Sequence, residues 1–268
     1  MTRDAGVTRW YRPAMVALSA VFLAMLALDL ATVVVRFDEA RPALAADFLL
    51  YRDAGARWLS GGGFYGAFQL AGPYVAWGNP SILYPPTTLL LFAPFTVLPA
   101  VLWWAIPVGV TTAVVAWHRP RPLAWPVLAM CLWFPTTGEV IWAGNPVLWV
   151  VAALALGTRW PAASVLVALK PTLGPFALWG IRHRSWWIGA AILALISIPF
   201  AGMWIDYIRA VLNARDPNGL FYSLNQVPTL LIPVVAWLGS SHRVAVGVRG
   251  RPQDTTSMKS AVKVTALP

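Results

Sequence analysis

The sequence has 268 residues, of which 59% are hydrophobic and only 11% are charged, whereas a soluble globular domain has about 45–50% apolar and about 25% charged residues. So little charge does not cover a water-facing surface of this size, which excludes a soluble binding module. The formal net charge is +10, but the basic residues are spread over short loops and both ends and form no stripe with aromatics, which argues against a nucleic-acid partner. The composition instead predicts an all-α polytopic membrane protein embedded in the lipid bilayer.

The residue types that mark many catalytic sites are scarce. Cys131 is the single cysteine and lies in an apolar segment, so we expect neither an intramolecular disulfide nor a cysteine-based metal site. The three histidines lie far apart and next to arginines, which suits loop ends. Phosphate-binding glycine loops, zinc-protease motifs and serine-hydrolase motifs are missing. The sequence therefore predicts no metal and no cofactor.

The first spanning helix is expected at residues 14–35, after three arginines and Pro13, a favourable first helical residue. The alternative is a secretory signal peptide cleaved near Ala43-Leu44-Ala45. The apolar stretch is too long for a signal peptide, and this site lies well beyond its end. We therefore favour a retained helix with a cytoplasmic N-terminus.

Residues 36–86 form the longest polar stretch within the apolar region and are expected to form an external first loop. Within it, residues 45–59 predict a short amphipathic helix that ends at the glycine run 61–63. The membrane portion restarts at Tyr84-Pro85-Pro86.

Further apolar segments follow, and basic residues stand at several of their ends. If these basic residues lie inside the cell, the ends of the segments alternate consistently between the inside and the outside of the membrane. This topology has about six to eight spans. It places further external loops at about 136–146 and 205–226. The alternation requires residues 160–181 to form a broken hairpin with Lys170 near its apex. The segments are 87–117 (one kinked span or two shorter ones), 123–135, 147–157, 160–181, 186–204 and 227–239.

The composition changes abruptly at Ser240. We therefore expect a transmembrane domain over residues 1–239 and a disordered, basic, cytoplasmic tail over residues 240–268.

Asp47 is the first candidate catalytic residue. It stands four residues before Tyr51, so the two share a face if this segment is helical. A carboxylate at the mouth of a membrane cavity can accept a proton from a hydroxyl nucleophile. The alternative role is structural, with Asp47 capping the short helix or pairing with Arg52 or Arg41.

Lys170 is the second candidate, because an ammonium within an apolar segment costs about 3 kcal/mol on insertion scales and is a functional hypothesis by default. It could hold a lipid-linked phosphate as a point charge, or it could extend to water from a short hairpin. Glu139 and Asn145 lie in the charge-poor outer loop and could line a polar pocket, although Asn145-Pro146 is also an ordinary turn signal.

Four segments, taken in order, resemble glycosyltransferase family 87, the polyprenyl-phosphate-mannose-dependent mannosyltransferases. Together they span about residues 40–190. The first segment, which is similar to the family's opening D-x-x-x-Y…A-G motif, is ADFLLYRDAGARWLSGGGFYG. The other three segments are LYPPTTLLLFAPFTVLP, AGNPVLWVVAALALG and VALKPTLGPFALWGIRHRSW.

The resemblance implies a GT-C-like membrane bundle that transfers a sugar, most often mannose, from a polyprenyl-phosphate donor to a glycolipid or glycan acceptor outside the cytoplasmic membrane. It implies that Asp47 is the catalytic base. It places Tyr51 in the motif of this base and Lys170 at the donor phosphate. The substrate-binding residues that we predict are Tyr51, Lys170, Tyr84, Asn145 and Glu139. Inverting chemistry with a phosphate leaving group needs one base and no metal.

Two departures keep other functions open. Gly144-Asn145-Pro146 stands where the family has a G-Q-x-N motif, and the chain is short for the family. A truncated, non-catalytic relative that serves as a partner subunit is therefore the first alternative. A transporter is the second, although no inverted repeat of interrupted segments supports it.

Overall fold

The computed structural model of the protein describes residues 4–35, 44–76, 80–215 and 223–241. The tail expected from Ser240 and the acidic start of the first loop fall almost entirely outside these residues, as does Arg41. The described chain is mostly helical, and its strands β1 (Tyr74–Val75) and β2 (Ala214–Arg215) form one short parallel pair. The structure thus agrees with an all-α fold.

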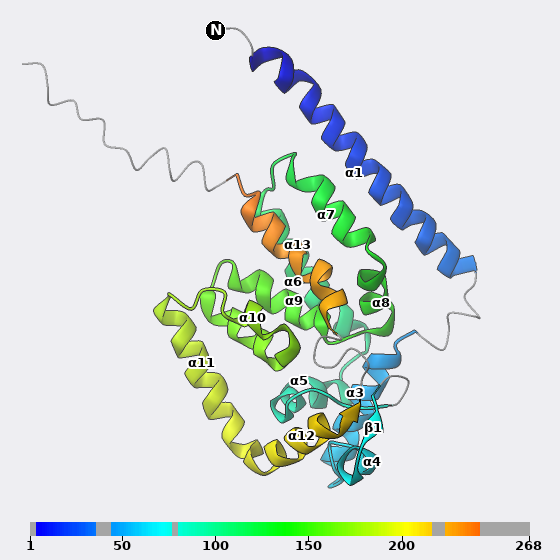
Figure 1. The fold of residues 1–268 in the computed structure, drawn as a ribbon, viewed down its shortest axis with the longest axis vertical. Helices are drawn as coiled ribbons and strands as arrows, with labels where there is room; N and C mark the ends of the chain where they lie inside the picture. Colours follow the sequence, from blue (N-terminus) through cyan, green and yellow to red (C-terminus); the bar gives the residue numbers. More distant parts are fainter. Residues whose placement is uncertain (1–3, 36–43, 77–79, 216–222, 242–268) are drawn as a thin grey trace, which may run out of the picture.

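Figure 1 shows how most of the longer helices are arranged. The long helix α1, in blue, runs along one edge beside α7. The helices α6, α7, α9 and α13 form a bundle, while α3, α4, α5 and α12 gather with the strands at the other end. In chain order the helices are α1 (Asp4–Val35), α3 (Ala46–Leu59), α4 (Ala67–Ala71), η2 (Pro86–Thr88), α5 (Leu89–Phe92), η3 (Ala93–Thr96), α6 (Val101–His118), α7 (Ala124–Trp133), α8 (Pro135–Ala143), α9 (Val147–Gly157), η4 (Pro161–Leu169), η5 (Pro171–Leu173), α10 (Gly174–Ala177), α11 (Arg184–Ser197), η6 (Ile198–Phe200), α12 (Ala201–Asn213), η8 (Leu224–Gln226) and α13 (Val227–Leu238).

Three described helices are long and apolar enough to cross a membrane, namely Trp10–Thr32, Val101–His118 and Arg184–Asn213. The pair α8 and α9 would make a fourth span, bent by 111°. These helices indicate a membrane protein. The predicted count of about six to eight spans would also require the shorter apolar helices at 86–96, 124–133 and 224–238 to cross.

Two local expectations are wrong. Pro13 lies inside α1 rather than at its start, because a proline in a long membrane helix removes only one backbone donor, a loss that such helices tolerate. The expected external loop at 136–146 is mostly the helix α8. Pro135 occupies its first turn, which suits the fixed φ of proline, and the chain leaves the helix only at Gly144, where φ is +66°.

The break expected at Lys170 is present. The helix η4 ends at Leu169, Lys170 is extended with φ −120° and ψ 91°, and the short helices η5 and α10 follow. A residue before proline is pushed out of the α region, so Pro171 accounts for the break.

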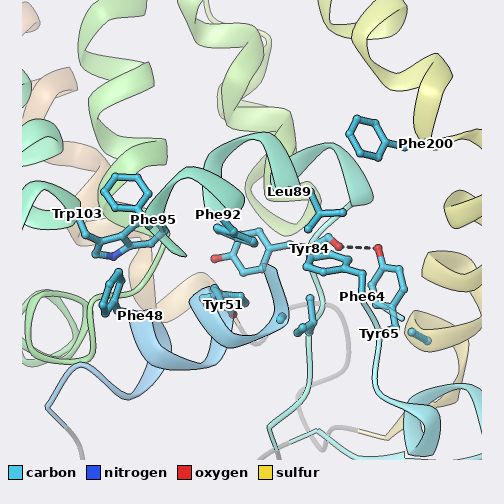
Figure 2. Close-up of a cluster of buried hydrophobic side chains, with 13 residues drawn as sticks. Phe48, Tyr51, Phe64, Tyr65, Tyr84, Leu89, Phe92, Phe95, Trp103 and Phe200 are labelled. Atoms are coloured by element: carbon cyan, nitrogen blue, oxygen red, sulfur yellow. Dashed lines mark hydrogen bonds between the residues drawn. The ribbon is translucent and has the colours of Figure 1, made fainter. Parts of the chain in front are cut away.

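Aromatic packing joins the first loop to the bundle (Figure 2). The Tyr51 ring stacks on Phe92 with centroids 4.7 Å apart and meets Tyr84 edge-on at 5.1 Å. Phe48 packs on Trp103 of α6 at 5.5 Å. The Tyr65 hydroxyl donates to the Tyr84 carbonyl at 2.9 Å, shown as the dashed line in Figure 2. These contacts fix α3 and Tyr84 relative to each other.

Gln69, which has no exposed surface, connects the segments around α4. Its amide nitrogen donates to the Tyr74 hydroxyl and to the Ile82 carbonyl, both at 3.0 Å. Its amide oxygen accepts from the backbone N–H groups of Gly66 at 3.1 Å and Ile82 at 3.2 Å. The Tyr74 hydroxyl in turn donates to the Ala210 carbonyl of α12 at 3.0 Å.

We expect Gln69→Leu to lower the free energy of unfolding by about 2–4 kcal/mol, because it leaves several buried polar groups without partners. Thermal unfolding in detergent measures the change. Tyr74→Phe, which removes a single hydroxyl from the same network, should cost about 1 kcal/mol. Equal stability of Gln69→Leu and the wild type would contradict this role.

Candidate active site

Asp47 lies in the first turn of α3, outside the three long apolar helices. Ala45, just before this turn, has the left-handed conformation with φ 58°, and its N–H donates to the Trp142 carbonyl of α8 at 2.8 Å. This hydrogen bond holds the start of α3 against the end of α8. The carboxylate of Asp47 therefore lies beside the turn that joins α8 to α9.

That turn is fixed by the aromatic residues around Gly144. The Trp103 Nε1–H donates to the Gly144 carbonyl at 2.7 Å. A Cβ on Gly144 would lie 2.6 Å from the Trp104 side chain and 2.9 Å from that of Phe48, so only glycine fits. Together with its positive φ, this contact makes glycine the residue required at the bend.

Asn145 connects Asp47 to Tyr84. Its Nδ2–H donates to Oδ2 of Asp47 at 2.5 Å. Its Oδ1 accepts from the Val147 N–H at 3.0 Å and more weakly from the Tyr84 hydroxyl at 3.4 Å. The amide thereby orients the carboxylate through a side chain whose own position is set by the turn.

Lys170 is only 3% exposed, and its Nζ lies 5.2 Å from the centroid of the Tyr84 ring. A cation above an aromatic face is stabilised by the ring quadrupole. Burial is the largest effect on the pKa of Lys170 and lowers it to about 7, and the negative charge of Asp47 opposes this effect. The alternative that Lys170 extends to water is wrong for the described protein, because the side chain is buried.

Burial raises the pKa of Asp47 above the ordinary carboxyl value of 3.8, whereas the Asn145 hydrogen bond and the positive charge of Lys170 lower it. Burial has the largest effect. A carboxylate with a raised pKa is a better proton acceptor than a solvated one.

Two of the structural roles considered for Asp47 are not observed, and the third, pairing with Arg41, lies outside the described residues. No side chain caps α3, and Arg52 pairs instead with its neighbour Asp53 at 2.8 Å. Glu139, predicted to line the same pocket, is exposed on α8 and takes no part in the contacts that join Asp47, Asn145, Tyr84 and Lys170. The bend at Gly144 directs Asn145 inward, but Glu139 precedes it on the exposed face of the helix.

An apolar cavity of about 320 Å³ adjoins these residues. Tyr84 and Pro146 line it next to Asn145, Leu169 lines it next to Lys170, and Leu193 of α11 closes another side. Trp149 also lines it, and its buried Nε1 has no hydrogen-bond partner among the described residues. The site therefore combines a carboxylate, a buried lysine and an apolar cavity.

Sequence reasoning missed Trp149, Trp103 and Gly144, which shape the cavity and the turn. Gly144 and the Asn145-Pro146 pair are the local signals for the turn. The tryptophans have no such signal, because their roles depend on tertiary packing. No group of three or more His, Cys, Asp or Glu side chains within the described ranges could hold a metal ion.

Comparisons with protein-family models, with curated proteins and with solved structures find no match to this chain. The resemblance to glycosyltransferase family 87 thus stays a prediction from the sequence motifs.

Proposed function

We propose that this protein is a membrane glycosyltransferase that moves a sugar, mannose by analogy, from a polyprenyl-phosphate donor to a hydroxyl of a glycolipid or glycan. The reaction would take place at the outer face of the cytoplasmic membrane. The observation that carries the proposal is the convergence of Asp47, Asn145, Tyr84 and Lys170 beside an apolar cavity.

In this mechanism Asp47 accepts the proton of the acceptor hydroxyl as its oxygen attacks the anomeric carbon of the donor sugar. The bond between that carbon and the phosphate oxygen breaks, and the lipid phosphate leaves with the bonding electrons. Lys170 offsets the negative charge on the phosphate. Asn145 orients the carboxylate, and the apolar cavity suits the lipid portion of the donor.

Transfer of labelled mannose from polyprenyl-phosphate mannose into a membrane lipid extract, by the purified wild-type protein, tests the proposal. We expect labelled lipid product. If a folded protein gives no product with several donors and acceptors, a non-catalytic partner subunit becomes the better explanation. Substrate flux into proteoliposomes without covalent product would instead indicate a transporter.

The rate of transfer should depend on pH through Asp47. The base acts only when ionised, so kcat/KM should rise with pH through the Asp47 pKa and level off above it. Because burial raises this pKa above 3.8, the midpoint should lie above that of an ordinary carboxyl group. A pH profile of kcat/KM measures it, and a flat profile down to about pH 4 would contradict the assignment.

A further inference from the structure

A second, larger cavity lies away from Asp47, where α9, η4 and α13 meet the segment before α11. Its volume is about 590 Å³. The charged or titratable groups on its wall are Arg182 and His183, accompanied by the Thr158 hydroxyl, and no carboxylate of the described residues lines it. Its chemistry therefore differs from that of the apolar cavity beside Asp47.

The wall of this cavity is built by specific contacts. Gly180 has φ +87°, and a Cβ there would lie 2.6 Å from the Pro161 side chain, so the turn before Arg182 requires glycine. The single proton of the Ser164 hydroxyl is shared between the carbonyl oxygens of Pro161 and Trp179. Trp179 packs edge-on against Trp237 of α13, with centroids 4.6 Å apart. The turn that carries Arg182 and His183 is thus held in place beside an aromatic surface.

More basic residues surround the cavity. Arg159, next to Thr158, lies over the Trp117 ring at 4.1 Å and near the Trp160 ring at 5.0 Å. Nε2 of His118 lies 2.8 Å from the Thr158 hydroxyl, which brings the end of α6, followed by Arg119, to the same region.

Arg159 and Arg182 form no ion pair with an acidic side chain among the described residues. The described ion pairs are Arg52 with Asp53 and Arg209 with Asp206, neither of which involves this region. An unbalanced cluster of cations beside a cavity attracts an anion from outside the protein. Arginine and tryptophan together at a helix end are typical of the membrane–water boundary.

We propose that this second cavity binds a phosphate-bearing anion, supplied by the headgroup of an anionic membrane phospholipid. Arg182 and His183 hold the phosphate oxygens, because guanidinium and imidazole N–H groups form charge-assisted hydrogen bonds with them. Trp179 and Trp237 offer an apolar surface to the start of the acyl chains. Basic pockets between membrane helices bind anionic headgroups in this way. The site does not depend on the proposed glycosyl transfer.

Native mass spectrometry of the full chain, released from detergent with added phosphatidylglycerol or phosphatidylcholine, tests this site. We expect phosphatidylglycerol to bind at least about tenfold more tightly than phosphatidylcholine, because both carry the phosphate but the choline ammonium cancels the negative charge of the second lipid. The double variant Arg182→Gln with His183→Gln should lose most of this preference. Both side chains are exposed, so an unchanged unfolding temperature is expected and is measured in parallel.

Arg209→Gln is the matched control, because it removes an exposed arginine from α12 and should change lipid binding by less than about twofold. A titration with inorganic phosphate distinguishes the two sources of the anion. Phosphate binding that depends on Arg182 and His183, without any lipid preference, would overturn the lipid headgroup as the source. Equal phosphatidylglycerol binding by the double variant and the wild type would overturn the site itself.

Discussion

Asp47→Asn should reduce transfer of mannose from polyprenyl-phosphate mannose by at least about 100-fold, or roughly 2.7 kcal/mol of activation free energy. The amide has nearly the same size and can still accept the hydrogen bond from Asn145, but it cannot accept a proton from the acceptor hydroxyl. The loss should therefore appear in kcat, with little change in KM for the donor. Radiolabelled transfer at equal amounts of folded protein measures the effect.

Asp53→Asn is the control for this experiment. Asp53 lies on the same helix, but its side chain is 64% exposed and pairs with Arg52, so its substitution should change the rate by less than about twofold. Equal transfer by Asp47→Asn and the wild type would remove Asp47 from the mechanism. Equal losses in both variants would indicate a general effect on α3 rather than catalysis.

The parts of the fold that the sequence predicts well are those with local causes. The helix expected at 45–59 is observed as α3, ending just before Gly61, whose φ of +85° suits glycine and few other residues. The break at Lys170 follows from the proline after it, and α9 and α13 match apolar segments with clear ends. In each case a glycine, a proline or a change in polarity lies within a few residues of the boundary.

The parts that sequence reasoning could not predict depend on contacts between distant segments. Residues 135–143 lack charge and look like a loop, yet they form α8, packed between the start of α3 and α13. Asn145 and Asp47 are 98 residues apart, and no periodicity relates them. Glu139 and Asn145 belong to the same short segment, and only the bend at Gly144 separates the exposed residue from the one beside Asp47.

The polar residues in the core also depend on contacts between distant segments, which the sequence does not reveal. Gln69 has no surrounding motif, but it joins α4, Tyr74 and Ile82 into one network. The sequence instead draws attention to charged residues, of which Glu139 proves to be exposed. Burial, rather than charge alone, separates Asp47 and Lys170 from the other candidates.

Lys170→Met should lower the rate of transfer by about 10-fold to 100-fold, or about 1.4–2.7 kcal/mol, while leaving the unfolding temperature unchanged or raised. Methionine fills a similar volume without a buried ammonium, so the desolvation cost of the cation disappears. The donor phosphate loses its positive partner, which should appear as a higher KM for the donor together with a lower kcat. Kinetics at varied donor concentration and thermal unfolding in detergent measure both effects.

This variant also separates an electrostatic role of Lys170 from a purely structural one. The positive charge of Lys170 lowers the pKa of Asp47, so removing it should move the midpoint of the pH profile of kcat/KM to higher pH. A structural role would instead lower the unfolding temperature and the rate together, with the midpoint unmoved. In the double variant with Asp47→Asn, the two losses should not add, because both substitutions act on one charge-coupled site. If the two losses of rate simply add, and the midpoint of the pH profile does not move in Lys170→Met, Lys170 acts independently of the base.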